Sequence, residues 1–346
     1  MGKASKGNRQ QLVRPVYWIT PQNKERDVPS SAAAHAKNVY LHYTQAELDH
    51  AYTQAEWASN MAVLMDSWAK RGAPLRRADK GYSELAYGPD PCETLDLFGG
   101  GGRVVHLHLH GGAWHRQSKE DCSFIAASMR AQNVPFVVPE FGKLPDYRMP
   151  DVLDQIARAT LWTFDRFVKT GRADGIVVSG HSSGAHMAAL LASYNFGGAL
   201  PVSALRAILC ISGSYDLQPV MLSARRQYIH LSNNERKRLS PIERIAQMKV
   251  PLHLLFGSEE SPEFIRQSLA YATALGRGGR LASCTRIEGA NHFEMADQLG
   301  VTNSEVGQRL EHLLNMPHEM GHRPRESHSI DAETTENNKP QRRRSR

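Results

Sequence analysis

The chain alternates between short apolar runs and longer amphipathic stretches. The apolar runs are SELAYG, ETLDLFG, RVVHLHLH, PFVVPE, GIVVSGH, RAILCISG, VPLHLLFG and LASCTRIEG. The first two predict a hairpin, because Gly88, Pro89 and Pro91 break the chain between them. The later runs largely lack polar alternation, which is typical of parallel strands covered on both faces.

The stretches between these runs have helical patterns. They are Phe124 to Ala131, the amphipathic segment DVLDQIARATLWTFDRFVKTG that Gly171 ends, AHMAALLASY, and EFIRQSLAYATALGRGG. Strands that alternate with helices predict an α/β fold with a mostly parallel central sheet flanked by helices. We expect one domain over residues 38–317.

Two parts of this domain lie outside the alternating pattern. Residues 38–80 predict N-terminal helices: Thr44 and Glu47 fit a capping box, and a second helix near Met61 is predicted to end at Gly72 and Pro74. Residues 214–249 form a connection that is longer than an ordinary crossover and rich in charge. We expect this connection to form a small helical cap over one end of the sheet.

The two ends of the chain are basic, and the formal net charge is +7. We predict a flexible arm over residues 1–37 and a disordered tail over residues 318–346, which closes on QRRRSR. Proteins that bind single-stranded nucleic acid combine basic residues with aromatic side chains on which the bases stack. No aromatic residues are interleaved with the charges of the tail. We therefore interpret the tail as solvated rather than as a nucleic-acid-binding arm.

The remaining composition bears on the compartment and on cofactors. No apolar run approaches the roughly 18 residues that a membrane helix needs, and no apolar segment follows the basic N-terminus as in a secretory signal. The four cysteines are scattered without a CxxC pair, which argues against a disulfide framework or a zinc site. We expect a cytoplasmic protein without a membrane partner, a metal or an organic cofactor.

The stretch GHSSGAH joins a predicted strand to a predicted helix. A G-x-S-x-G sequence in this context is typical of a nucleophile elbow, in which a strained turn exposes a serine above the sheet. Gly180 and Gly184 allow the backbone to crowd around the turn. Ser182 at the apex is the predicted nucleophile, and the backbone N–H of Ser183 is a predicted oxyanion donor.

A second glycine-rich turn, HGGAW, follows the strand that begins at Val104. Small residues there let backbone N–H groups approach a developing oxyanion to about 2.7–3.1 Å. Gly112 and Ala113 are the predicted donors, Gly111 permits the turn, and His110 and Trp114 complete the motif.

A serine nucleophile needs a base, and the base needs an orienting carboxylate. His292 lies in the loop after the last predicted strand, where this type of fold carries its base. Glu260, three residues after Gly257, is the favoured acid. Glu259 and Glu263 are the alternatives.

Together these motifs resemble the α/β-hydrolase superfamily, and more narrowly its arylformamidase (kynurenine formamidase) family. The resemblance runs from about Tyr43 to His292 and includes AYGPDPCETLDLF, HGGAW, GHSSGAHMAALL, ISGSYDLQPV and SPEFIRQS. It implies a serine hydrolase with a triad of Ser182, Glu260 and His292. The family usually carries Asp where this chain has Glu260.

The resemblance implies a small aromatic amide or ester as substrate, such as an aryl formamide. Trp114, Tyr215 and residues Met221 to Tyr228 are the predicted substrate contacts, and pairing into a homodimer is a further implication. A carboxylesterase, or a carbamate or amide hydrolase of aromatic-compound catabolism, is the alternative within the same fold. The non-enzymatic alternative is a ligand receptor, which normally requires a lost triad residue.

Overall fold

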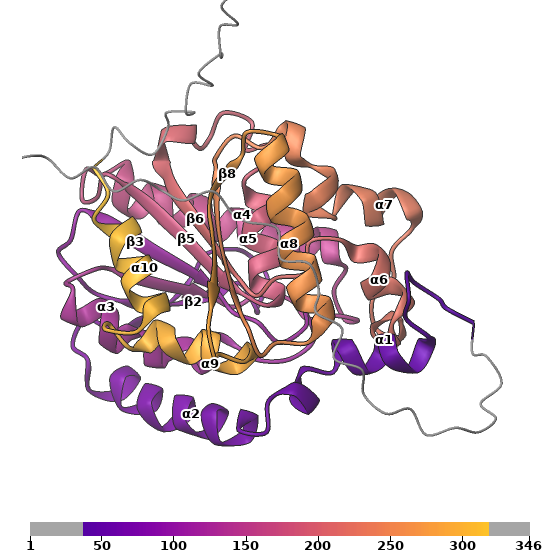
Figure 1. Cartoon of the computed structure of the whole chain (residues 1–346). Helices are drawn as coiled ribbons and strands as arrows, with labels where there is room; N and C mark the ends of the chain where they lie inside the picture. Colours follow the sequence, from indigo (N-terminus) through magenta and orange to yellow (C-terminus); the bar gives the residue numbers. More distant parts are fainter. Residues whose placement is uncertain (1–36, 318–346) are drawn as a thin grey trace, which may run out of the picture. The chain divides into compact units, whose positions relative to one another are not determined.

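The computed structural model describes residues 37–317, and its centre is an eight-stranded sheet (Figure 1). The strands lie in the order β1-β2-β4-β3-β5-β6-β7-β8; β2 runs antiparallel to both β1 and β4, and the other neighbours are parallel. Their bounds are β1 (Ser83–Ala86), β2 (Thr94–Phe98), β3 (Val104–Leu109), β4 (Phe136–Pro139), β5 (Gly175–His181), β6 (Leu205–Ile211), β7 (Leu252–Gly257) and β8 (Leu281–Ile287). The predicted hairpin and the predicted mostly parallel sheet are confirmed. The predicted arm, apart from Lys37, and the predicted tail lie outside the described residues.

Helices cover both faces of this sheet (Figure 1). One face carries α4, α5 and α8, and the other carries α3, α9 and α10. Outside these layers, α1 packs on α8, and α2 packs on the segment Lys119–Ile125 and on α9. Successive residues of the central strands serve the two faces in turn: Val178 of β5 packs with the first group, and Val177 packs with the second. This arrangement explains why the strand sequences are apolar at consecutive positions. The bounds of these helices are α1 (Gln45–Tyr52), α2 (Met61–Ala78), α3 (Ala126–Ala131), α4 (Met149–Thr163), α5 (Ser183–Leu191), α8 (Pro262–Arg277), α9 (His292–Asp297) and α10 (Glu305–Leu314).

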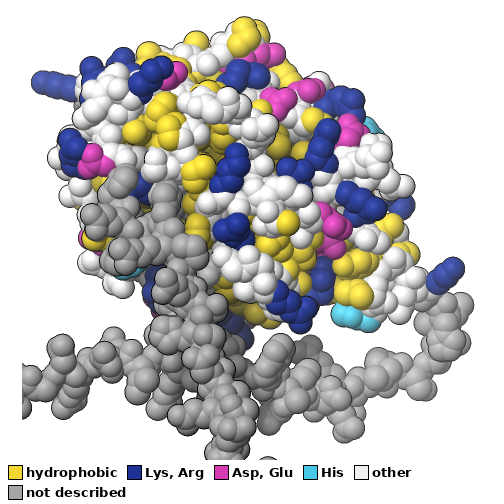
Figure 2. Space-filling view, turned by 90° about the horizontal axis from the view of Figure 1, so that it is seen from above, with side chains coloured by type: hydrophobic (Ala, Val, Ile, Leu, Met, Phe, Trp, Pro, Cys, Tyr) yellow, Lys and Arg dark blue, Asp and Glu magenta, His cyan; other side chains and the backbone are white. Residues whose placement is uncertain are grey.

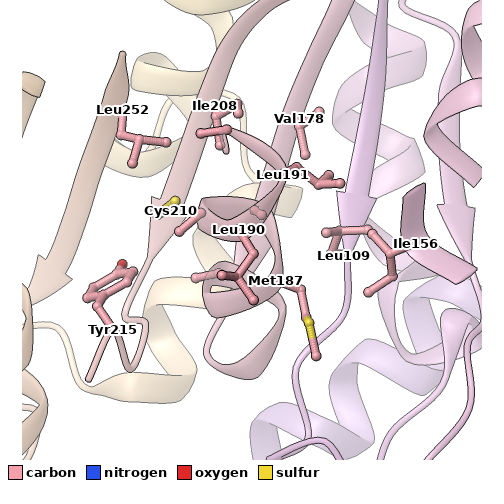
Figure 3. Close-up of a cluster of buried hydrophobic side chains, with 14 of the residues drawn as sticks. Leu109, Ile156, Val178, Met187, Leu190, Leu191, Ile208, Cys210, Tyr215 and Leu252 are labelled. Atoms are coloured by element: carbon pink, nitrogen blue, oxygen red, sulfur yellow. The ribbon is translucent and has the colours of Figure 1, made fainter. Parts of the chain in front are cut away.

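The helix α5 is buried along its whole length. Its side chains Met187, Leu190 and Leu191 belong to the same buried cluster as Val178 and Ile208 of the sheet, and Leu191 lies next to Val178 (Figure 3). Each fully buried aliphatic side chain of this size contributes about 1.5–3 kcal/mol. The packing therefore fixes the position of α5 on the sheet, and with it the turn that precedes the helix.

The helix α2 extends further than its sequence predicts. It was expected to end at Gly72 and Pro74, but it continues through both to Ala78, so this prediction is wrong. Gly72 lies against the segment Lys119–Ile125, where a Cβ on Gly72 would come within 2.9 Å of the Ser123 Cβ. The glycine thus serves a close contact between two segments rather than a helix end. Packing against this segment, with Trp68 and Phe124 stacked at 5.3 Å, offsets the cost of the internal proline.

Short helices fill the connection between β6 and β7 that was predicted to form a cap. They are α6 (Leu217–Leu222), Ala224–Gln227, α7 (Asn233–Arg238), Pro241–Glu243 and Ile245–Gln247. Gln45 of α1 donates to the carbonyl of Leu222, and Asp49 of α1 accepts from the N–H of Ala224. The N-terminal helix and this connection therefore support each other.

The surface of the described residues mixes apolar and charged side chains. On the part of the face that Figure 2 leaves uncovered by grey, Lys and Arg side chains are scattered among apolar and acidic ones and do not form one continuous stripe. Within residues 37–317, none of the helices combines the length and the apolar character needed to cross a membrane.

A partly buried acid, Glu140, ties the ends of two central strands together. It follows β4. Its carboxylate accepts a hydrogen bond at 3.2 Å from Nε2 of His110, which directly follows β3, and forms an ion pair with Lys143. Burial alone favours the neutral acid, but the hydrogen bond and charge of His110, together with Lys143, outweigh it and lower the pKa of Glu140 to about 2. The carboxylate is therefore ionised over the whole physiological range.

We predict that Gly72→Ala destabilises the protein by about 1–3 kcal/mol, because the added methyl group meets Ser123 and the backbone of Phe124. Gly276→Ala in α8 is the matched control, since the nearest atom to its added Cβ is 4.0 Å away. That variant should gain about 0.5–1 kcal/mol of helix stability. Urea unfolding of both variants measures the effects, and equal shifts in the two would contradict this account of Gly72.

We also predict a pH-dependent cost of Glu140→Gln. Because the pKa of Glu140 is lower in the folded chain than in the unfolded one, its stabilisation is complete above about pH 4.5 and is lost as the pH falls toward 2. The variant should be about 2 kcal/mol less stable than the wild type at pH 7, and the gap should narrow steadily below pH 4.5. Urea unfolding at pH 7, 5, 4 and 3 measures it, and a constant gap would contradict the assignment.

Candidate active site

Ser182 lies at the sharp turn between β5 and α5. Its backbone has φ 56° and ψ −120°, a left-handed conformation that costs energy for any residue with a side chain. Two glycines make the turn possible: a Cβ on Gly180 would lie 2.3 Å from the Gly184 carbonyl oxygen, and a Cβ on Gly184 would lie 2.1 Å from that of Leu109. The local structure is the strand, turn and helix of a nucleophile elbow.

His292 contacts Ser182 from a segment 110 residues further along the chain. It is the first residue of α9, and its Nε2 lies 3.0 Å from the Ser182 Oγ. The side chain of Asn291 caps this helix by accepting from two backbone N–H groups. His181, next to Ser182, donates from its Nε2 to the backbone carbonyl of His292 at 2.8 Å. Burial lowers the pKa of His181 well below its usual value, so this ring is neutral.

Glu260 completes a hydrogen-bonded chain. Its Oε2 lies 3.0 Å from Nδ1 of His292, and its Oε1 accepts from the N–H of Gly257 at 2.7 Å and from the Ser212 hydroxyl at 2.6 Å. The two donors orient the carboxylate, which in turn orients the imidazole. Ser182, His292 and Glu260 are 6%, 3% and 3% exposed, so water competes little for these contacts.

The other two acids left open by the sequence are elsewhere. Glu259 is exposed and accepts from the Ser258 hydroxyl. Glu263 is buried, forms a bidentate ion pair with Arg266 and accepts from the hydroxyl of Tyr52. Of the three, the structure brings Glu260 alone to His292.

The HGGAW turn has an unusual backbone. Gly112, Ala113 and Trp114 have φ values of 97°, 55° and 61°, and a Cβ on Gly112 would lie 2.0 Å from the carbonyl oxygen of Arg116. Within the described residues, the backbone N–H groups of Gly112 and Ala113 have no hydrogen-bond acceptor. Ser183 opens α5, and its N–H belongs to the first turn of the helix, which has no acceptor within the helix. The three predicted donors are thus free to bind an oxygen atom.

The side chain of His110 lies in the protein interior and supports this turn. It is 1% exposed, and its ring stacks on Phe141 with centroids 4.1 Å apart. Its Nδ1 contacts the Gly111 carbonyl at 3.0 Å, and its Nε2 contacts Glu140. It therefore holds the turn in place from below.

Trp114 is anchored by a residue to which the sequence reasoning gave no role. Its indole Nε1 donates to Nδ1 of His186 at 3.2 Å, and Nε2 of His186 donates to the carbonyl of Leu239 at 2.7 Å. Burial lowers the pKa of His186 to about 4, so the ring is neutral with its proton on Nε2. His186 thus links the elbow helix, the HGGAW turn and the connection between β6 and β7.

Tyr215 is not brought to the site. Its side chain is 1% exposed and stacks on Tyr271 of α8 with ring centroids 4.2 Å apart. In Figure 3 it lies beside Cys210 in the buried cluster around α5. The ring fills the core because the chain turns inward directly after β6. Of the predicted segment Met221 to Tyr228, two side chains face the HGGAW turn: Arg225 lies near Trp114, and Tyr228 stacks on His115 at 4.8 Å.

Three contributors were missed by sequence reasoning: His181, His186 and Ser212. The first two lie within GHSSGAH, where their proximity to Ser182 was a usable signal. Ser212 follows the end of β6, the edge at which parallel strands collect functional side chains. Arg225 lies within the segment Met221 to Tyr228 that was predicted to contact the substrate, but nothing in the local sequence distinguishes it from its neighbours.

This arrangement supports acyl transfer. A hydroxyl, an imidazole and a carboxylate are joined by two contacts of 3.0 Å, beside free backbone donors. Across residues 37–317, no cluster of three or more His, Cys, Asp or Glu side chains is arranged to hold a metal ion.

Comparison with known proteins agrees with this geometry. The chain is 24% identical to the kynurenine formamidase of Danio rerio over 268 residues, which cover 73% of this chain and 90% of that protein. It is 27% identical over 251 residues to the esterase LipQ of Mycobacterium tuberculosis, covering 64% of this chain and 60% of that one. A crystal structure of a provisionally named thioesterase from Silicibacter sp. TM1040 shares the fold, with a TM-score of 0.66, 23% identity, and coverage of 76% and 98% of the two chains.

A family model described as the alpha/beta hydrolase fold matches residues 106–296. This match spans more than half of the chain and contains the HGGAW turn, the elbow and the acid and base positions. The chain therefore belongs to the α/β-hydrolase family and is an enzyme of formamidase or esterase type.

Proposed function

We propose that the protein is a serine hydrolase that cleaves an aryl formamide or a related small aromatic amide or ester. Ser182 is the nucleophile, His292 the general base and acid, and Glu260 the orienting carboxylate. The observation that carries the proposal is the continuous hydrogen-bonded chain from Ser182 through His292 to Glu260. No cofactor takes part in the proposed reaction.

The proposed mechanism follows from the proton positions. With Nδ1–H of His292 donated to Glu260, its Nε2 is free to accept the Ser182 proton as Oγ attacks the carbonyl carbon. The N–H groups of Gly112, Ala113 and Ser183 bind the oxyanion of the tetrahedral intermediate. His292 then protonates the departing amine or alcohol. Water attacks the formyl- or acyl-serine by the same route in reverse and releases the acid.

The preference for an aryl formamide rests on two supports. The Danio rerio protein, with which the chain shares 24% identity over most of both lengths, is named a kynurenine formamidase. The HGGAW turn also puts a buried Trp114 next to the proposed oxyanion donors, which favours a small acyl group such as formyl. An N-formylkynurenine-like compound is the proposed substrate, which would place the enzyme in tryptophan catabolism.

A carboxylesterase is the second candidate, and the similarity to LipQ favours it. The same triad and donors serve an ester as well as an amide, so the acyl and leaving-group pockets decide between them. A ligand receptor on this fold has less support, because all three triad positions carry competent side chains in contact.

We predict that the wild type hydrolyses N-formyl-L-kynurenine with a higher kcat/KM than p-nitrophenyl acetate or butyrate. Ser182→Ala should lower both activities at least about a thousandfold, because the nucleophile is lost. Product absorbance measures the rates, and thermal unfolding checks that the variant is folded. Ester cleavage without formamide cleavage would assign the enzyme to the esterases. Activity that survives in folded Ser182→Ala would overturn the nucleophile.

We predict that Glu260→Gln lowers kcat by a factor on the order of 10²–10⁴. The donors Gly257 and Ser212 hold the amide oxygen, which turns the amide NH₂ toward Nδ1 of His292. His292 would then carry its proton on Nε2 and lose its capacity to accept one from Ser182.

Glu259→Gln is the matched control for this experiment, since the exposed Glu259 makes no contact with His292. It should keep the wild-type rate. Equal losses in the two variants, or none in Glu260→Gln, would reject Glu260 as the orienting acid.

A further inference from the structure

Arg225 extends from the connection between β6 and β7 into a group of aromatic rings beside the proposed active site. Its guanidinium carbon lies 5.0 Å from the ring centre of Tyr52, 5.8 Å from that of Phe264 and 5.9 Å from that of Trp114. These rings come from α1, α8 and the HGGAW turn. Three distant parts of the sequence thus converge on one cation.

The hydrogen-bond donors of this guanidinium are mostly unused. Nη2 donates to the carbonyl of Tyr52 at 2.9 Å, which accounts for one of five N–H groups. Across residues 37–317, no carboxylate lies within ion-pair distance of Arg225. Its remaining nitrogens are not among the fully buried unpaired atoms, so they keep some contact with solvent.

The surroundings of Arg225 make an unpaired charge costly. Although the residue as a whole is partly exposed, desolvation of its head group lowers the pKa of Arg225 below its usual value. An arginine nevertheless remains charged at neutral pH. Contacts with aromatic faces offset only part of the lost hydration. A bound anion would offset the rest.

Arg225 is close to the proposed reaction centre. Trp114 follows the proposed oxyanion donors Gly112 and Ala113 in the chain. The ring of Phe264 lies 4.8 Å from the ring of His292. The ring of Phe264 therefore contacts both the guanidinium and the base, and the ring of Trp114 connects the guanidinium to the oxyanion turn.

We propose that Arg225 binds a carboxylate on the leaving group of the substrate and so selects anionic aromatic amides or esters. This inference rests on the proposed function and narrows its substrate class. A guanidinium matches a carboxylate with two parallel hydrogen bonds, and the aromatic rings around it suit the arene that carries this group. Arg225 acts on binding and orientation, while the bond-breaking steps remain with Ser182, His292 and Glu260.

A purely structural role is the competing explanation. Arg225 ties the C-terminal end of α1 to the β6–β7 connection through the Tyr52 carbonyl and ring. That role uses one donor and one ring, and it predicts a loss of stability without any change in substrate selection. The two roles differ in what they do to neutral and anionic substrates.

The experiment compares formanilide with 2-formamidobenzoate, which differ by one carboxylate, in the wild type, Arg225→Gln and Arg225→Lys. The measured quantity is the ratio of kcat/KM for the anionic substrate to that for the neutral one. Comparing this ratio between variants cancels the intrinsic reactivity of the two compounds. Arg225→Gln should lower the ratio at least tenfold, mainly through KM, and Arg225→Lys should retain part of it. Arg226→Gln is the matched control, because Arg226 is the next residue in the chain and is exposed. This variant should keep the wild-type ratio.

The outcomes separate this inference from the proposed function. An unchanged ratio in Arg225→Gln, with a lower unfolding temperature, would assign Arg225 to structure and overturn the inference while leaving the formamidase proposal intact. If the wild type cleaves neither formamide, the formamidase proposal fails. The same ratio is then measured with phenyl acetate and 2-acetoxybenzoate. A drop in Arg225→Gln supports carboxylate selection by an esterase, and no drop rejects it.

Discussion

The close approach of two backbones at the elbow is the constraint on which the rest of the site depends. Gly184 packs against the carbonyl groups of Leu109 and His110, at distances that leave no room for a side chain. This contact brings the end of β3 and the start of α5 together. The HGGAW turn then begins beside the first N–H groups of α5, and Ser182 is held in a left-handed conformation between them. The contact of Gly184 with the end of β3 thereby sets the spacing between the nucleophile and the oxyanion donors.

Buried histidines distribute this constraint to the surrounding elements. His181 fixes the backbone of His292, and His186 joins the indole of Trp114 to the β6–β7 connection. Below them, His106 and His108 of β3 both contact the Ser179 hydroxyl, at 2.6 and 2.7 Å. Burial lowers the pKa values of these rings, so they remain neutral and each nitrogen keeps one hydrogen-bonding role. A rigid polar framework results inside an otherwise apolar core.

The catalytic residues and the proposed substrate-binding residues differ in burial. The elbow, the base and the acid lie on the sheet and its helices, where packing leaves little freedom. The β6–β7 connection contributes Arg225 and Tyr228 from short helical segments with partly exposed side chains. A rigid scaffold keeps the catalytic groups in place, while the loops that it carries are where substrate selection commonly varies. The proposed anion site lies at the junction of the two parts.

Much of this architecture could be predicted from local patterns. Uninterrupted apolar runs marked the parallel strands, because both faces of the sheet are covered, and the paired glycines marked the two tight turns. The local pattern predicted the wrong structure where a residue type occurs in two different structural settings. Gly72 and Pro74 indicate a helix end in isolation, yet packing against Lys119–Ile125 carries α2 through them. Tyr215 is the type of residue that often contacts a ligand, yet the segment directly after β6 is buried and its ring stacks on Tyr271 in the core.

The sequence by itself determined the fold class, the turn that exposes Ser182 and the region in which an acid and a base follow it, because periodicity and turn chemistry are local properties. Only the tertiary structure decided which of Glu259, Glu260 and Glu263 contacts His292, since that choice depends on the direction in which each side chain leaves the turn after β7 or the first turn of α8. It also decided the convergence of Arg225 with Tyr52, Phe264 and Trp114. Trp114 and Arg225 are more than a hundred positions apart in the chain. The packing of α1 on α8, and of α8 on the sheet, helps to bring these residues together.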